Sequence, residues 1–407
     1  MRNLLIGSVF IILAAFSFGQ KLQHETGAVN IEVPVRVFKG ETFIDNLSIK
    51  DFKIYENGVL QKIEAVYLIS KTNINKEESV LPADEARKTY TPQVNRHYVL
   101  VFEVLDYLPK MGEAIDHFFR NVMTAEDTLT LMTPRKSYNF KKDALKNLPR
   151  DAIVQQVIGL LKKDTTLANT EYKAMVKEIE QLYTQTGVFQ WETGDWKNFI
   201  RDILSRLESY RFVDEKKLLA FSDFLKSKRG QKNVFLFFQK EMIPKYNPYM
   251  EILMTSMTNP EKPDAALDFL ELTTFYRRDI TFDVEKIKQY FSDSSIQTHF
   301  LYLTKTPEIG LDVERRETLS KSNVHYVEQS EDIFSAFSEV AKATGGFSSS
   351  SANTVSAFQK AVDASENYYL LYYSPKDYKE DGTFRNIEVR VKEGGYRVTH
   401  RAGYLAK

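Results

Sequence analysis

Two acidic residues follow a continuous apolar run in the first half of the chain. Glu103 comes directly after the run at residues 97–102, and Asp106 lies three residues further on. Two carboxylates at this spacing suit general acid–base chemistry, or the ligation of a hard cation such as Mg²⁺. Acidic residues at strand ends are also common in proteins without catalytic activity. We therefore treat the pair as a candidate site and favour the interpretation without catalysis.

The sequence lacks other signatures of catalysis. It contains no Gly-x-Ser-x-Gly pattern for a hydrolase nucleophile and no Gly-x-x-x-x-Gly-Lys phosphate loop, so we expect the serines at 349–351 to form a solvated loop. No two of the six histidines are spaced as a metal-binding pair, and the absence of cysteine excludes thiolate sites. We expect His299, in a strand-like run, to be a core residue with hydrogen-bond partners.

Two segments at the ends of the chain alternate apolar and polar residues with a period of two, which is typical of strands with one buried face. The first lies within residues 28–70 and contains Pro34, which favours an edge strand or a bulge. The second lies within residues 375–407. Because each segment is small on its own, we expect both to share one all-β sandwich, with a polar linker at residues 71–95.

The centre of the chain, residues 96–374, has a different pattern. Continuous apolar runs alternate with segments of helical period, and such runs are typical of strands buried on both faces of a parallel sheet. The pattern predicts an α/β fold with a mostly parallel sheet and helices on both faces. Two charged, helical stretches at about 151–211 and 246–278 are too long for loops and are predicted to be helical insertions. The four runs lie at residues 97–102, 233–238, 298–303 and 368–373.

The N-terminus predicts export. Arg2 precedes an uncharged apolar run from Leu4 to Phe16, and small residues precede Gln20, which is the order of a signal peptide over residues 1–19. The run is short for a bilayer span, which needs about 20 apolar residues. We expect a periplasmic or extracellular protein with no transmembrane segment after cleavage.

The charge balance restricts the partners. Lysine and arginine total 55 and aspartate and glutamate also total 55, so no basic excess favours nucleic acid. We expect the partners to be other proteins, and the oligomeric state stays open.

Several motifs at the two ends of the chain resemble those of the von Willebrand factor type A (VWA)-related proteins common in Acidobacteria. The resemblance covers most of the mature chain and is weakest near 151–211. It implies a Rossmann-like VWA domain beside the small β sandwich. The motifs are VPVRVF at 33–38, NLSIKDFKIYENGVLQ at 46–61, ATGG at 343–346, YYLLYYSP at 368–375, DGTFRNI at 381–387 and RAGY at 401–404.

The resemblance also implies a metal-ion-dependent adhesion site. Its Asp-x-Ser-x-Ser run would fall on Glu103, Leu105 and Tyr107, of which leucine cannot bind a metal and tyrosine is a poor substitute for serine. Asp106 is one residue out of register. After the strand that ends at Phe238, the acidic ligand would fall on Gln239 or Lys240, and a lysine there would repel a cation. We expect a degenerate site with no metal and no cofactor, with Mg²⁺ as the alternative.

The sequence therefore predicts an exported, non-enzymatic protein-interaction module of the adhesion or scaffold type. The partner-binding face would include Asp106, Tyr107, Lys240 and Glu241. The alternative is a metal-dependent adhesion protein, or an enzyme subunit that uses a remodelled acidic site at Glu103 and Asp106.

Overall fold

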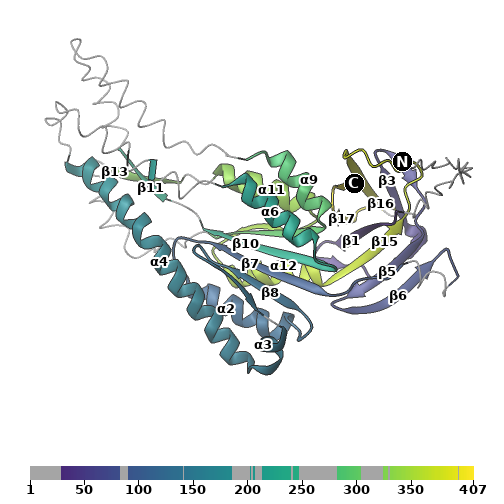
Figure 1. Ribbon diagram of the computed structural model, residues 1–407, viewed down its shortest axis with the longest axis horizontal. Coiled ribbons are helices and arrows are strands. Elements are labelled where there is room, and N and C mark those ends of the chain that lie inside the picture. Colours follow the sequence, from purple (N-terminus) through teal and green to yellow (C-terminus); the bar gives the residue numbers. More distant parts are fainter. Residues whose placement is uncertain are drawn as a thin grey trace, which may run out of the picture.

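The structure is a computed structural model, and the strands among its described residues form two six-stranded sheets, one four-stranded sheet and one two-stranded sheet (Figure 1). It describes residues 29–82, 90–140, 142–185, 202, 205–206, 213–239, 242–246, 282–303, 324–328, 331–392 and 394–407.

One six-stranded sheet, called the central sheet below, contains both parallel and antiparallel pairs. Neighbouring strands from β14 to β8 are parallel, and β9 adds an antiparallel edge. The rings of Phe102 and Phe237, on paired strands, stack with centroids 4.4 Å apart. The strand order is β14 (Ser348–Ser351), β12 (Ile296–Leu303), β10 (Gln231–Gln239), β7 (Arg96–Glu103), β8 (Thr128–Met132) and β9 (Ser137–Phe140).

Helices pack against both faces of the central sheet (Figure 1). On one face, Phe235 and Phe237 pack with residues of α2 (Pro109–His117), the π-helical turn Phe118–Val122, α4 (Arg150–Gln185) and α12 (Thr354–Glu366). On the other face, Val234 and Leu236 pack with α6 (Glu215–Lys226), α9 (Val284–Asp293) and α11 (Glu331–Ala343). A short helix, α3 (Lys142–Asn147), lies between β9 and α4.

The second six-stranded sheet, called the terminal sheet below, is antiparallel throughout. It joins the two ends of the chain, since β1 pairs with both β15 and β17. The strand order is β17 (Arg397–His400), β1 (Ile31–Lys39), β15 (Asn367–Tyr373), β5 (Ala65–Ser70) and β6 (Asn73–Ser79), with β2 (Thr42–Phe43) on β1.

The four-stranded sheet is antiparallel as well, and its core is continuous with one face of the terminal sheet. Its order is β18 (Gly403–Leu405), β16 (Phe384–Val391), β3 (Phe52–Glu56) and β4 (Val59–Gln61), and a short 3-10 helix (Ile49–Asp51) precedes β3. The two-stranded sheet pairs β11 (Met242–Tyr246) with β13 (Val324–Glu328). The domain boundaries stated above stay a prediction.

The predicted fold class, a Rossmann-like VWA domain with a mostly parallel sheet and a small β sandwich, is wrong. Three of the four sheets are antiparallel, the central sheet is mixed, and the terminal sheet has as many strands as the central one. The apolar run at 368–373, predicted to belong to the parallel sheet, forms β15 between antiparallel neighbours. The run is continuous because Tyr369 and Leu371 pack into one core while Leu370 and Tyr372 pack into another. Burial on both faces does not require parallel neighbours.

The predicted insertion at 151–211 is described only in part. Its first section is the single 36-residue helix α4. Val154, Val157 and Leu161 of this helix lie in the core under the central sheet. Of the insertion predicted at 246–278, the structure describes Tyr246 alone, which ends β11, and residues 247–278 lie outside the described residues.

Candidate functional site

The candidate site centres on residues 104–108, the loop that joins β7 to α2. Glu103 ends β7 and is exposed, whereas Leu105, Asp106 and Tyr107 are half-buried. Pro109 begins α2, where its missing N–H is not needed. The parallel pairing of β7 with β8 and β10 brings this loop beside the carboxyl ends of those strands.

Gln239, the last residue of β10, holds the loop from one side. Its Oε1 accepts hydrogen bonds from the backbone N–H of Leu105 at 2.7 Å and of Asp106 at 2.6 Å. The side chain is buried, and its Nε2 has no hydrogen-bond partner among the described residues. The neutral amide of Gln239 therefore occupies the place where the resemblance implied an acidic metal ligand. It accepts hydrogen bonds from the backbone of the loop.

Helix α4 holds the loop from the other side. Asn169, which is buried, donates through Nδ2 to the carbonyl oxygen of Val104 at 3.1 Å and to that of Leu105. Lys173, one turn further along α4, forms an ion pair with the Asp106 carboxylate. The Asp106 charge is therefore balanced by an amine of the chain itself.

Asp164 anchors the same stretch of α4 to the hairpin of β8 and β9. Its Oδ2 accepts from the Thr133 hydroxyl at 2.8 Å and from the Tyr138 hydroxyl at 2.7 Å. The hydrogen bond to Asp164 raises the pKa of Tyr138, so the phenol keeps its proton at neutral pH. A buried carboxylate that accepts two hydroxyl donors fixes the helix in position over the strand ends.

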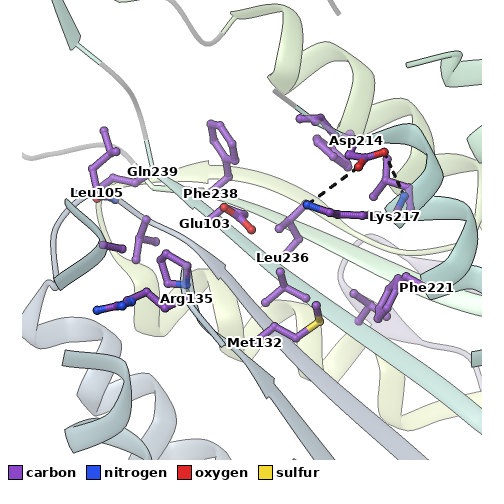
Figure 2. A pocket seen from close by; sticks show the side chains of 18 of the residues that line it. Glu103, Leu105, Met132, Arg135, Asp214, Lys217, Phe221, Leu236, Phe238 and Gln239 are labelled. Atoms are coloured by element: carbon purple, nitrogen blue, oxygen red, sulfur yellow. Dashed lines mark hydrogen bonds and ion pairs between the residues drawn. The ribbon is translucent and has the colours of Figure 1, made fainter. Parts of the chain in front are cut away.

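A pocket of about 700 Å³, the strand-end pocket, is lined by residues of the central sheet, of α4 and of α6, and some of these are shown in Figure 2. Leu236 and Phe238 of β10 and Phe221 of α6 belong to its apolar wall, and Glu103, Arg135, Asp214 and Lys217 bring charged groups to it. The other lining residues in the described part are Val101, Val104, Leu105, Met132, Pro134, Leu167, Ala168, Asn169, Glu171, Tyr172, Val213, Leu218, Val234, Gln239, Phe291, Thr298 and Phe337.

A smaller hollow of about 280 Å³, the loop hollow, lies between the loop and the outer side of α4. Its lining combines the loop with hydroxyl groups and one amine of the helix. Burial raises the pKa of Tyr107, so its hydroxyl stays protonated at neutral pH. The lining residues are Leu105, Asp106, Tyr107, Thr165, Thr166, Thr170 and Lys173.

The residues proposed from the sequence fall into two groups. Glu103, Leu105 and Gln239 line the strand-end pocket, and Asp106 and Tyr107 line the loop hollow. Lys240 and Glu241, also named as part of the partner-binding face, lie outside the described residues.

Sequence reasoning missed the contribution of α4 to the site. Thr165, Asn169 and Lys173 recur at intervals of four, so they share one face of the helix. Two of the three, Thr165 and Asn169, are buried despite their polarity. A polar stripe within a helix that also has a buried apolar stripe is the signal that could have pointed to these residues.

His299 differs from what the sequence predicted. It is fully buried on β12, and its ring stacks on Phe235 with centroids 4.6 Å apart, but neither ring nitrogen has a hydrogen-bond partner among the described residues. Burial lowers the pKa of His299 to about 3. The ring is therefore neutral at physiological pH, and it belongs to the core of the sheet.

Two features are absent from the described residues. No group of three or more histidine, aspartate or glutamate side chains there could hold a metal ion. Likewise, none of the helices in this part of the chain is long and apolar enough to cross a membrane. The absence of a metal and of a cofactor stays a prediction.

No protein-family model and no curated protein matches the sequence. Among solved structures, a match is found to the crystal structure of the human COPII-coat protein Sec24c, with 8% sequence identity and a TM-score of 0.29. The match covers 80% of this chain and 45% of that one, so the chain spans less than half the length of that protein. A likeness at this level carries no argument about fold, family or function.

Proposed function

We propose that the protein is an exported, non-enzymatic binding protein that holds a protein partner on the face formed by residues 104–108 and helix α4. The observation that carries the proposal is the fixed position of this loop. Gln239 and Asn169 bind its backbone from opposite sides, and Lys173 pairs with Asp106. A loop held in this way loses little conformational entropy when it binds a partner, which favours affinity.

The chemistry of the face supports binding. Tyr107 contributes an aromatic ring whose hydroxyl bonds the backbone of Gly112 in α2, and Thr166 and Thr170 add exposed side chains to the same hollow. Aromatic residues with a polar tip are enriched at protein interfaces. The ion pair with Lys173 engages one of the two carboxylates that the alternative, a remodelled acidic site at Glu103 and Asp106, would need. We therefore favour the binding function over that alternative.

The test uses two arginine substitutions on the same helix. Thr170→Arg places a large side chain in the loop hollow, whereas Ala174→Arg adds the same side chain to an exposed position of α4 that lines neither pocket. Proteins of the native periplasm or secretome that the immobilised chain retains would be purified singly, and their dissociation constants measured against the wild type and both variants.

We expect at least one purified partner to bind the wild type and Ala174→Arg with equal affinity, and Thr170→Arg at least tenfold more weakly. The proposal fails if no purified protein binds saturably, or if both variants bind as the wild type does. Circular dichroism melts of the two variants show whether each still folds.

A further inference from the structure

Helix α4 has an exposed row of lysine and threonine side chains, called the lysine row below. Its members follow one another at intervals of three or four residues, so they share one side of the helix, and all five are exposed. The row lies roughly opposite the side that packs into the core under the central sheet, and it is about 22 Å long. The members are Lys162, Thr166, Thr170, Lys173 and Lys177.

The lysine row concentrates positive charge in a chain whose charges balance overall. Lys163 is exposed beside the row, so four ammonium groups lie within about a third of the helix circumference. The acidic residues of the same stretch lie on other sides of the helix. Asp164 is buried and accepts from two hydroxyl groups, and Glu171 lines the strand-end pocket. The Asp106 carboxylate pairs with Lys173 and offsets part of the charge, so this side of α4 remains positive.

The middle of the lysine row borders the loop hollow, since Thr166, Thr170 and Lys173 line it. The Thr166 hydroxyl donates to the carbonyl oxygen of Lys162, and the Thr170 hydroxyl donates to that of Thr166, both at 2.8 Å. Because these hydroxyl protons are engaged within the helix, the exposed donors of the row are its lysine ammonium groups. A partner that extends from the hollow along α4 therefore meets cationic donors toward both ends of the row.

The composition of the row favours protein carboxylates over other anionic surfaces. A helix that lies on a lipid surface needs large apolar side chains beside its basic ones, whereas threonines separate the lysines here. Leu167, an exposed apolar residue of this stretch, lines the strand-end pocket instead. Arginine, which binds phosphate through two parallel hydrogen bonds, is not a member of the row.

We propose that the lysine row binds an acidic segment of the protein partner, with carboxylates spread over about 22 Å. This inference rests on the proposed function and adds the chemistry of the partner to it. A single exposed ion pair contributes little affinity, so the binding depends on several pairs along the helix. Such pairs are screened by salt, which gives the interaction a measurable signature.

The probe is a labelled peptide of alternating glutamate and serine with four glutamates, which spans about 20 Å when it is extended. Its counterpart has glutamine in place of every glutamate. Fluorescence anisotropy with the full chain should show saturable binding of the glutamate peptide, and at least tenfold weaker binding of the glutamine peptide. The affinity for the glutamate peptide should fall as NaCl is raised from about 50 to about 300 mM.

A three-lysine variant combines Lys162→Gln, Lys163→Gln and Lys177→Gln and leaves the pair of Lys173 with Asp106 intact. It should bind the glutamate peptide about tenfold more weakly, as expected for the loss of three exposed ion pairs.

The matched control makes the same change of charge at exposed lysines in and around the four-stranded sheet, and it should bind as the wild type does. It combines Lys53→Gln, Lys62→Gln and Lys379→Gln.

The inference is overturned if the glutamate peptide does not bind saturably, or if the three-lysine variant binds it as the wild type does. It is also overturned if polyphosphate or phosphatidylglycerol vesicles bind more tightly than the peptide and with the same dependence on the three lysines. That result would assign the row to a phosphate-bearing surface.

Failure of the proposed function has a different signature, because Thr170→Arg tests it by filling the loop hollow. A purified partner that binds Thr170→Arg weakly and the three-lysine variant normally would support the proposed function and overturn this inference. Peptide binding as expected, with no purified protein retained, would support the acidic chemistry of the row and overturn the proposed function alone.

Discussion

Asp106 and Lys173 form an ion pair although 67 residues separate them in the chain. The contact joins the loop after β7 to the middle of α4, and it places an amine beside the carboxylate that a metal ion would need. A divalent ion at this position would have to displace the Lys173 ammonium or tolerate its repulsion. This ion pair is a further argument against a bound metal, beside the expectation from the sequence, which rested on Leu105, Tyr107 and Lys240.

We expect the thermal stability of the protein to be independent of divalent ions. A bound ion would stabilise the fold by about 2.7 kcal/mol at a hundredfold excess over its dissociation constant. Melting temperatures in millimolar Mg²⁺ and in excess chelator should agree within error. A reproducible rise of several degrees with Mg²⁺, abolished in Asp106→Ala, would instead establish a metal site.

Gln239→Leu should reduce the free energy of unfolding by about 2 kcal/mol, because two backbone N–H groups lose their acceptor in a partly buried setting. Gln239→Glu, which keeps the acceptor oxygen, should cost less than half as much. Urea denaturation of the three proteins measures both differences. Equal losses in the two variants would show that the Oε1 contacts do not stabilise the loop.

Stability should fall as the pH drops below about 6.5. Burial lowers the pKa of His299 to about 3, whereas the unfolded chain takes up the proton near 6.5. Between these values the unfolded state binds more protons than the folded state, so acid favours unfolding and stability returns as the pH rises. The loss from His299 should be on the order of 2 kcal/mol at pH 5.

The variant His299→Phe can keep the stacking on Phe235 and removes the titrating group. Its unfolding free energy should therefore depend less on pH between 7.5 and 5 than that of the wild type. His117→Phe, at a position with a partly exposed side chain, serves as the matched control and should retain the wild-type dependence. Identical pH profiles for His299→Phe and the wild type would exclude His299 as the source.

Export should remove residues 1–19. Mass spectrometry of the protein recovered from outside the cytoplasm should find an N-terminus at Gln20, in its open or cyclised form, because small residues precede that position. Recovery of an intact Met1 in the exported protein would show that the apolar run is not a cleaved signal.

The positions of three strands in the central sheet were readable from the sequence, whereas β14 was not, because its serines at 349–351 were expected to form a solvated loop. The apolar runs at 97–102, 233–238 and 298–303 lie within β7, β10 and β12. A run of consecutive apolar residues reports burial on both faces, and that property is local enough to be seen in one segment. The position of Glu103 and Asp106 at the end of β7 followed from the same pattern.

The partners of each strand were decided only by tertiary structure. The run at 368–373 has the same apolar pattern as the others because cores cover both faces of β15. Its neighbours β1 and β5 are nevertheless antiparallel to it. The contacts of the site also depend on tertiary structure. Asn169 and Lys173 contact the loop after β7 because α4 passes beside it in the folded chain. The pattern of apolar side chains indicates how deeply a segment is buried. Whether its neighbouring strands run parallel or antiparallel to it, and which distant residues it contacts, depends on how the whole chain packs.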